Sequence, residues 1–334
     1  MSSQTKKTTY SPNLKTSLTK FLKIAIPLGL GVFLIWYSYS KFTPEQLTEI
    51  KTNFKDANYG FVILAVVLSQ ISHISRAYRW SFMLAPLGYK PKLFNNFMAI
   101  CIAYLMNIFI PKSGEVSRAL VIDKYEGVPF DKAFGTIISE RVVDLIFLLG
   151  FTLAAFLLQF DILKDYILSN IPLTKLLFAL GGLFVMVLVF FLFLKFSKSV
   201  LQQKLKQFLI GLKEGIFSIL KMKKKGAFIL HTCFIWGLYL LSFYTATFAL
   251  DATSAISVGT LITAFVIGSF TFAFTNSGFG SYPFFVAGIL AVFGIAETVG
   301  TAFGWIVWTS NIASIVLFGA LSFFILPVYN KVIK

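Results

Sequence analysis

Residues 133–159, AFGTIISERVVDLIFLLGFTLAAFLLQ, combine a long apolar run with three charged side chains near its start. At ~1.5 Å per residue, a helix of this length is long enough to cross the ~30 Å hydrocarbon core of a bilayer. Glu140, Arg141 and Asp144 would be costly against lipid, so they should face other helices or a polar cavity. The stretch therefore predicts a membrane-spanning helix that turns a charged patch toward the interior of a helical bundle.

The composition of the whole chain supports this interpretation. Of its 334 residues, 57% are hydrophobic and 13% are charged, and the mean hydropathy is +0.79. A soluble chain of this length would be less apolar. The formal charge of +16 lies in loops beside apolar runs, as expected for cytoplasmic loops at an anionic membrane, so nucleic acid is excluded as a partner. Cys101 and Cys233 lie in apolar segments, and we expect buried, inert thiols without a metal site.

Six stretches are predicted to be full spans: 21–40, 60–85, 133–159, 174–195, 226–250 and 302–326. The connection 195–225 carries nine lysines against one acidic residue, so the positive-inside rule places it in the cytoplasm. The same rule places the basic tail 1–20 and the tail 327–334 there, with the bundle in the cytoplasmic membrane. We interpret 21–326 as a single transmembrane domain, in which 196–225 forms a basic amphipathic helix on the inner leaflet.

Two further apolar regions must each enter and leave the membrane on one side, because the chain lies on the same side before and after them. The second half of 93–132 carries too many charges for a lipid-facing helix, which favours a re-entrant hairpin from the cytoplasm. For 255–296 we favour a hairpin entering from outside, although two full crossings fit equally well. Opposed hairpins would place broken helices near the midplane, as in many transporters. The predicted fold is an all-α polytopic membrane bundle of about six spans and two re-entrant hairpins.

All four arginines of the chain lie between residues 76 and 141, whereas its lysines are spread along the whole length. The planar fork of arginine suits two-pronged binding of phosphate or carboxylate, which lysine cannot reproduce. Arg76 and Arg79 come near the end of the second span, close to Trp80. Anchoring at the inner membrane interface is the favoured interpretation there, and phosphate binding at the same depth is the alternative.

A second charged group lies in residues 111–118, PKSGEVSR, where Pro and Gly break the helix. We expect Ser113 to cap the next helix and Glu115 to pair with Arg118 one turn later. A capped turn explains the serine and glycine, but it does not explain an arginine in an apolar setting.

The third charged group lies near the start of the long apolar run 133–159. Glu140 and Asp144 share a helix face, and Arg141 can reach Asp144. Because intramembrane charges are functional by default, a functional role is favoured over a structural ion-pair network. The predicted substrate-binding residues are Arg76, Arg79, Glu115, Arg118, Glu140, Arg141 and Asp144.

In these blocks the chain resembles the transmembrane-region family of lysylphosphatidylglycerol synthases, also called the flippase-like domain family. The resemblance rests on Arg76-Ala-Tyr-Arg79-Trp80, on Asn107 followed by Pro111-Lys-Ser-Gly114-Glu115-x-x-Arg118, and on Glu140-Arg141-x-x-Asp144. The apolar layout agrees from about residue 20 to residue 326. In two-domain members this membrane unit precedes a soluble aminoacyltransferase domain and is thought to move the aminoacylated lipid between leaflets. The resemblance implies a stand-alone flippase-like unit without synthase activity.

The late glycine-rich motif departs from the family pattern. It reads Asn276-Ser-Gly-Phe-Gly-Ser-Tyr-Pro283 with no nearby carboxylate, where the family usually has a Pro-Gly-Gly-Leu-Gly type followed by an acid. If that acid helps to define a cationic headgroup, the ligand here differs.

The chain has no HExxH, no Walker loop and no paired-cysteine zinc motif, so we predict neither enzymatic activity nor a cofactor. The leading hypothesis is a protein that binds and translocates a phospholipid or a lipid-linked polar molecule, with arginines on its phosphate. A proton-coupled secondary transporter of a small anion is the first alternative. The second is a non-transporting accessory subunit of a separate soluble enzyme. The sequence indicates no oligomeric state.

Overall fold

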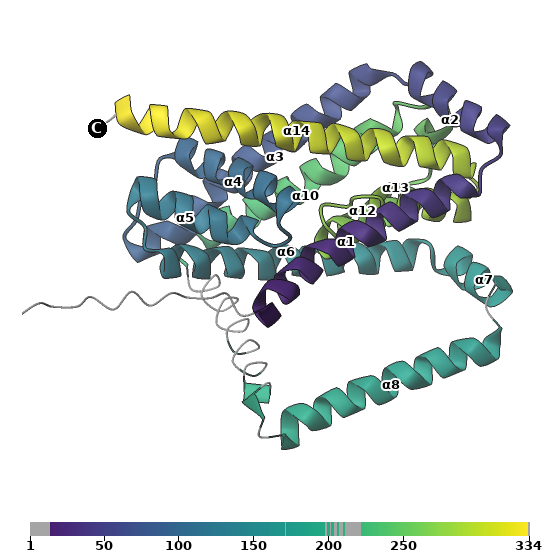
Figure 1. The fold of residues 1–334 in the computed structure, drawn as a ribbon, viewed down its shortest axis with the longest axis horizontal. Coiled ribbons are helices and arrows are strands. Elements are labelled where there is room, and N and C mark those ends of the chain that lie inside the picture. The colour runs from purple at the N-terminus through teal and green to yellow at the C-terminus, as the bar shows by residue number, and fades with distance from the viewer. Residues whose placement is uncertain are drawn as a thin grey trace, which may run out of the picture.

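The computed structural model describes residues 14–332 apart from 171, 198, 201, 204–205, 207–209 and 211–221. Almost all of the described residues are helical, and they contain no strand (Figure 1). The helices are α1 (Leu14–Ser40), α2 (Pro44–Asp56), α3 (Tyr59–Leu84), η1 (Ala85–Leu87), α4 (Leu93–Phe109), α5 (Gly114–Glu126), α6 (Phe130–Leu158), α7 (Phe160–Asn170), α8 (Leu173–Phe196), α10 (Lys225–Thr247), α11 (Asp251–Ser254), α12 (Val258–Phe274), α13 (Ser281–Val292) and α14 (Glu297–Val332). The predicted all-α membrane bundle is confirmed.

Four of the described helices are long and apolar enough to cross a membrane: α3 with η1, α6, α10 and α14. They lie at four of the six predicted spans. The other two predicted spans, 21–40 and 174–195, coincide with α1 and α8, whose described apolar stretches, Ala25–Ser40 and Phe184–Phe196, are shorter. The short helices α2, α7 and α11 were not predicted, because they lie in connections between apolar runs.

Three sequence predictions concern the ends and the basic connection. Residues 1–13 of the predicted basic tail and most of the predicted amphipathic segment 196–225 lie outside the described residues. Helix α14 continues past the boundary predicted at residue 326, through Pro327 to Val332. Its last turns are held by Asn330, whose buried side-chain amide exchanges two hydrogen bonds of 3.0 Å with that of Asn95 in α4.

The two regions predicted as hairpins each form a pair of short antiparallel helices, α4–α5 and α12–α13. The first pair connects the end of α3 with the start of α6, and the second connects the end of α10 with the start of α14. Figure 1 places the first pair at the end of the bundle that holds the C-terminus and the second pair toward the opposite end. The predicted arrangement of two opposed hairpins therefore matches the structure.

The long helix α14 packs against both hairpins in turn. Near its start, Gly304 lies against Pro283 of α13, and further on Gly319 lies against Leu105 of α4. The two hairpin tips also meet, because the Asn276 side chain donates a 2.9 Å hydrogen bond to the carbonyl oxygen of Ile108 at the end of α4. The turns of the two hairpins are therefore in direct contact.

The tip of the second hairpin depends on glycine. Gly280 has φ +68°, which L side chains rarely adopt, and a Cβ atom there would overlap the carbonyl group of Gly31 in α1. Ser277, also at positive φ, is held because its carbonyl oxygen accepts a 2.9 Å hydrogen bond from the Trp308 indole of α14. The glycine-rich motif therefore fits α1 and α14 closely around the turn.

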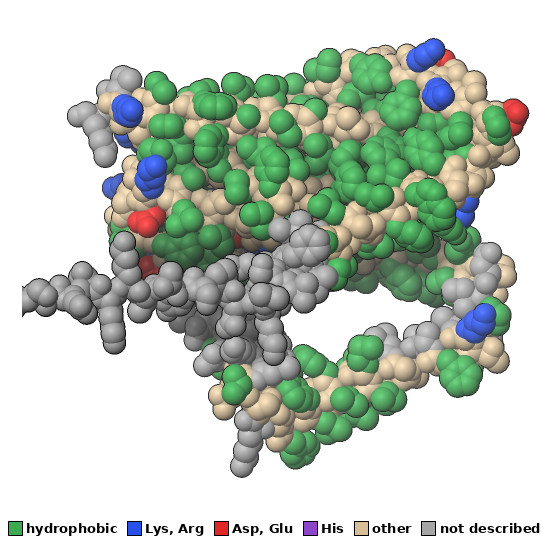
Figure 2. Space-filling model, in the orientation of Figure 1, with side chains coloured by type: hydrophobic (Ala, Val, Ile, Leu, Met, Phe, Trp, Pro, Cys, Tyr) green, Lys and Arg blue, Asp and Glu red, His purple; other side chains and the backbone are tan. Residues whose placement is uncertain are grey.

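Apolar side chains form both the interior and much of the outer surface. One buried cluster includes Trp236, Phe265 and Phe303, and a second, nearer the C-terminal end, includes Trp80 and Phe228. Figure 2 shows that hydrophobic side chains cover the visible face of the bundle, while charged side chains gather at its two ends. This distribution suits a surface surrounded by lipid. The expectation of two buried cysteines holds for Cys101 but is wrong for Cys233, which is exposed on α10.

Candidate functional site

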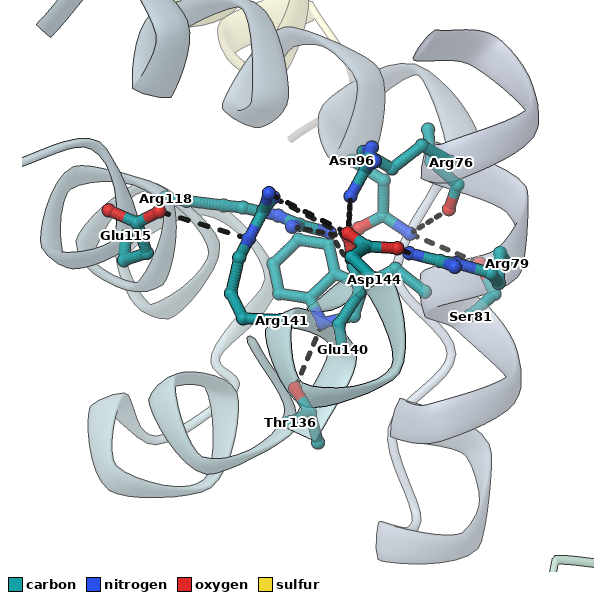
Figure 3. Close-up of polar contacts among 12 residues, drawn as sticks. Arg76, Arg79, Ser81, Asn96, Glu115, Arg118, Thr136, Glu140, Arg141 and Asp144 are labelled. Carbon is teal, nitrogen blue, oxygen red and sulfur yellow. Dashed lines mark hydrogen bonds and ion pairs between the residues drawn. The ribbon is translucent and has the colours of Figure 1, made fainter. Parts of the chain in front are cut away.

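The two carboxylates of α6 lie at the centre of a buried charged cluster (Figure 3). Arg76 of α3 donates through Nη1 to Glu140 Oε1 and to Asp144 Oδ2, both at 2.6 Å. Its Nη2 atom donates to the Tyr239 hydroxyl of α10 at 3.3 Å. The predicted shared face of Glu140 and Asp144 is confirmed, since one guanidinium bridges them.

Two further arginines complete the centre of the cluster. Arg118 of α5 binds Glu140 with both arms of its fork, at 3.3 and 3.1 Å. Arg79 of α3 donates to Asp144 Oδ1 at 3.1 Å and to the Thr232 hydroxyl at 2.9 Å, and it forms an ion pair with Glu140 at 3.0 Å. All four carboxylate oxygens of the two acids therefore face an arginine nitrogen.

Arg141 and Glu115 lie at the edge of the cluster. Arg141 contacts Glu140 at 3.7 Å, Asp144 at 3.6 Å and Glu115 of α5 at 3.8 Å. The predicted reach of Arg141 to Asp144 is confirmed. The predicted pairing of Glu115 with Arg118 is wrong, because the Arg118 guanidinium turns inward to Glu140 and leaves Glu115 beside Arg141.

The turn between α4 and α5 sets the position of Glu115 and Arg118. Gly114 packs so closely on α4 that a Cβ atom there would overlap the carbonyl oxygen of Ala103. The Gly114 N–H donates to Asn107 Oδ1 at 2.7 Å. The predicted capping role of Ser113 is therefore wrong: Asn107 accepts from the start of α5, while the Ser113 hydroxyl donates back to Met106 O at 3.0 Å.

Arg76 and Arg79 are not interfacial anchors, which corrects the interpretation favoured from the sequence. Their exposed fractions are 2% and 0%, because α10 and α6 cover the face of α3 on which they lie. Burying a charge is costly unless it is paired, and here each guanidinium has its carboxylate partners. The seven predicted site residues thus come together in one cluster from three helices.

Several members of the site were not predicted as site residues. Trp80 stacks under Arg118, with the guanidinium carbon 3.9 Å from the ring centroid, and its indole donates to Thr136. Tyr239 and Thr232 accept hydrogen bonds from Arg76 and Arg79. These side chains lie in ordinary apolar runs, so only the Trp80 position beside the arginines gave any signal in the sequence.

The cluster carries a surplus of positive charge. Its four arginines and three carboxylates leave one formal positive charge without a counter-ion among them. The Nε atom of every one of the four arginines is buried and has no hydrogen-bond partner within the described part of the chain. Unpaired buried donors are costly, and they favour an acceptor at this site.

A small cleft opens beside Arg141. Its volume is about 10 Å³, which is room for about one water molecule. It is lined by Ile100, Ala103, Tyr104, Asn107, Glu115, Arg118, Ile137 and Arg141. Among the described residues, no group of His, Cys, Asp and Glu side chains is arranged to hold a metal ion. The chemistry of the site is therefore that of guanidinium groups and carboxylates beside a small cleft with both polar and apolar lining residues.

Three known proteins have sequences similar to parts of this chain. A UPF0104 membrane protein of Pyrococcus horikoshii is 23% identical over 252 residues, 68% of this chain and 73% of that protein. A UPF0104 membrane protein of Methanocaldococcus jannaschii is 34% identical over 101 residues, 29% of this chain and 30% of that protein. The glycosyltransferase AglD of Haloferax volcanii is 26% identical over 151 residues, 45% of this chain but only 24% of that protein.

No solved structure matches the chain significantly. The model of the lysylphosphatidylglycerol synthase TM region matches residues 24–327, which include both hairpins and every residue of the charged cluster. The chain is a multi-pass membrane protein that belongs to the lysylphosphatidylglycerol synthase transmembrane-region family.

Proposed function

We propose that the protein binds the polar headgroup of a phospholipid or of a lipid-linked molecule at the charged cluster and moves it between leaflets. The observation that carries this proposal is the position of the cluster, inside a bundle whose two opposed hairpins meet at their tips. Buried arginines in a membrane bundle mark a binding site or a pathway by default. In many transporters, interrupted helices supply polar backbone groups to the binding site.

The names of the relatives support a lipid or lipid-linked ligand. The family is named after a synthase of an aminoacylated lipid, and the Haloferax relative is named a glycosyltransferase. For this chain we propose no catalysis, but action beside a separate soluble enzyme that modifies the translocated molecule. On the lysine pattern we place both chain ends in the cytoplasm and the bundle in the cell membrane.

Reconstituted vesicles test translocation directly. The purified chain is placed in liposomes containing a tail-labelled phospholipid, and dithionite, which stays outside, quenches label in the outer leaflet only. We expect the wild-type protein to expose the inner-leaflet label. Replacing Arg141 by Gln removes a charge-assisted contact with the headgroup, worth about 1.5–3 kcal/mol, so the rate should fall at least about tenfold.

Lys164→Gln is the matched control for this variant, because Lys164 lies on α7 outside the cluster and its side chain is 45% exposed. It should leave the rate unchanged. Failure of the wild-type protein to expose any inner-leaflet label, in vesicles where it is correctly folded, would rule out translocation by the chain alone. Uptake of a water-soluble anion by the same vesicles would instead favour a solute transporter.

A further inference from the structure

The four arginines of the cluster are not equivalent. Arg76, Arg79 and Arg118 each donate hydrogen bonds to Glu140 or Asp144, and their side chains are at most 3% exposed. The Arg141 guanidinium, by contrast, makes no hydrogen bond within the described part of the chain, and its ion-pair contacts are longer than 3.5 Å. Three arginines are thus engaged by the two acids, while the donors of the fourth are free for a ligand.

Arg141 is also the arginine that a ligand can reach most easily. Its side chain is 37% exposed and lines the cleft between α4, α5 and α6. Asn107, on the same cleft, uses its Oδ1 atom for the Gly114 N–H, which leaves its amide nitrogen as a second donor toward the cleft. Two kinds of N–H donor on one cleft suit the oxygens of a phosphate group.

Glu115 occupies the space beside Arg141. Its carboxylate lies 3.8 Å from Arg141 Nε, too far for a hydrogen bond, and its side chain is 25% exposed in the first turn of α5. Figure 3 shows Glu115 on one side of Arg141 and the central acids on the other. A phosphate that binds Arg141 must therefore displace this carboxylate, which acts as an internal competitor.

The charge balance selects the ligand. All oxygens of Glu140 and Asp144 already face arginine nitrogens, so neither carboxylate is available for an ammonium group. The surplus is one positive charge while Glu115 stays beside Arg141, and it becomes two when Glu115 is displaced. A headgroup with net negative charge would reduce this surplus, whereas a cationic headgroup would add to it.

We infer that Arg141 is the ligand-binding arginine and that the site selects a phosphate-containing group with net negative charge, in competition with Glu115. This inference rests on the proposed function for the source of the phosphate, a lipid headgroup. The same chemistry would accept a free phosphate monoester, and the two sources are separated by experiment.

The test measures binding and does not depend on translocation. The full chain in detergent is titrated with phosphatidylglycerol, which is anionic, and with phosphatidylcholine, which is zwitterionic, and bound lipid is counted by native mass spectrometry. We expect the wild-type protein to prefer phosphatidylglycerol. Arg141→Gln should raise the Kd for phosphatidylglycerol about 10- to 100-fold and abolish the preference. Glu115→Gln should lower that Kd several-fold, because it removes the competing carboxylate.

Two further variants and a competition experiment separate ligand binding by Arg141 from a purely structural role. Arg141→Lys keeps the charge but not the fork, so it should restore part of the preference, which a purely structural role would not predict. Lys164→Gln should bind as the wild-type protein does. Glycerol phosphate that competes with the lipid at similar concentration would identify a free phosphate ester as the ligand class, whereas lack of competition would favour the lipid.

An unchanged preference in Arg141→Gln, or equal binding of both lipids by the wild-type protein, would overturn the inference. Either result could coexist with lipid translocation in vesicles, which would leave the proposed function intact. Selective, Arg141-dependent binding without translocation would support the binding inference and contradict the proposed function. The two proposals therefore fail separately.

Discussion

Glu140→Gln should be the most damaging single substitution in the cluster. The Glu140 carboxylate accepts hydrogen bonds from Arg76 and Arg118 and lies 3.0 Å from Arg79. Glutamine keeps the size but removes the charge, so Arg76 and Arg79 would be left with Asp144 alone and Arg118 with no carboxylate partner. Removing one partner from a buried ion network costs about 3–5 kcal/mol, because the remaining charges stay desolvated. We expect a large fall in the melting temperature of the detergent-solubilised protein and a low yield of monodisperse material.

The control for this prediction is Asp161→Asn, which also neutralises an acidic side chain. Asp161 lies on α7 with its side chain 86% exposed and pairs loosely with Lys164, so its contribution should be about 0–1 kcal/mol. Tryptophan fluorescence melting compares the two variants under one condition. If Glu140→Gln melted as Asp161→Asn does, the cluster would not be what holds α3, α5 and α6 together.

Gly280→Ala should be nearly as damaging, for reasons of shape. The methyl group would meet the carbonyl of Gly31, which is backbone and cannot rotate away, and the backbone would keep a φ of +68°. Strain of this kind costs on the order of 1–3 kcal/mol before the overlap is counted. The hairpin tip should shift away from α1, which would also disturb the hydrogen bond from Asn276 to Ile108.

Gly288→Ala provides a matched comparison within α13. No atom lies within 4 Å of a Cβ built there, and alanine is the better helix former. We therefore expect Gly288→Ala to melt at or above the wild-type temperature and Gly280→Ala well below it. Equal melting temperatures for the two variants would show that the close approach of α1 to the hairpin tip contributes little to stability.

The sequence predicted the elements of the fold better than the contacts of the site. Apolar runs and lysine-rich connections suffice to find α3, α6, α10 and α14 and the two hairpins, because lipid forces backbone groups to pair within each helix. Helix α14 extends beyond the predicted span 302–326, and its last turns pair through Asn330 with Asn95, which is 235 residues away. No local pattern contains such a contact.

The contacts of the charged cluster could also be predicted only in part, because several of them join residues far apart in the sequence. Glu140 and Asp144 could be recognised because charges in an apolar run require partners. The depth of Arg76 along its own helix placed it near the membrane interface, whereas its burial is due to Tyr239 and other α10 side chains far along the chain. Glu115 was paired with Arg118 by its spacing, but Trp80 and Glu140 attract that guanidinium more strongly than a neighbour one turn away.

The contacts of α14 with both hairpins fix the number of residues between them. Trp308 holds the second tip and Gly319 lies against α4, eleven helical positions or about 16 Å further on. Inserting one residue between these points would rotate the remainder of the helix by about 100° and advance it by about 1.5 Å. Gly319 and Asn330 would then both leave their partners on α4. The number of residues in this part of α14 therefore sets the distance between the two hairpin contacts. Insertions or deletions that are tolerated in loops should destabilise the protein here.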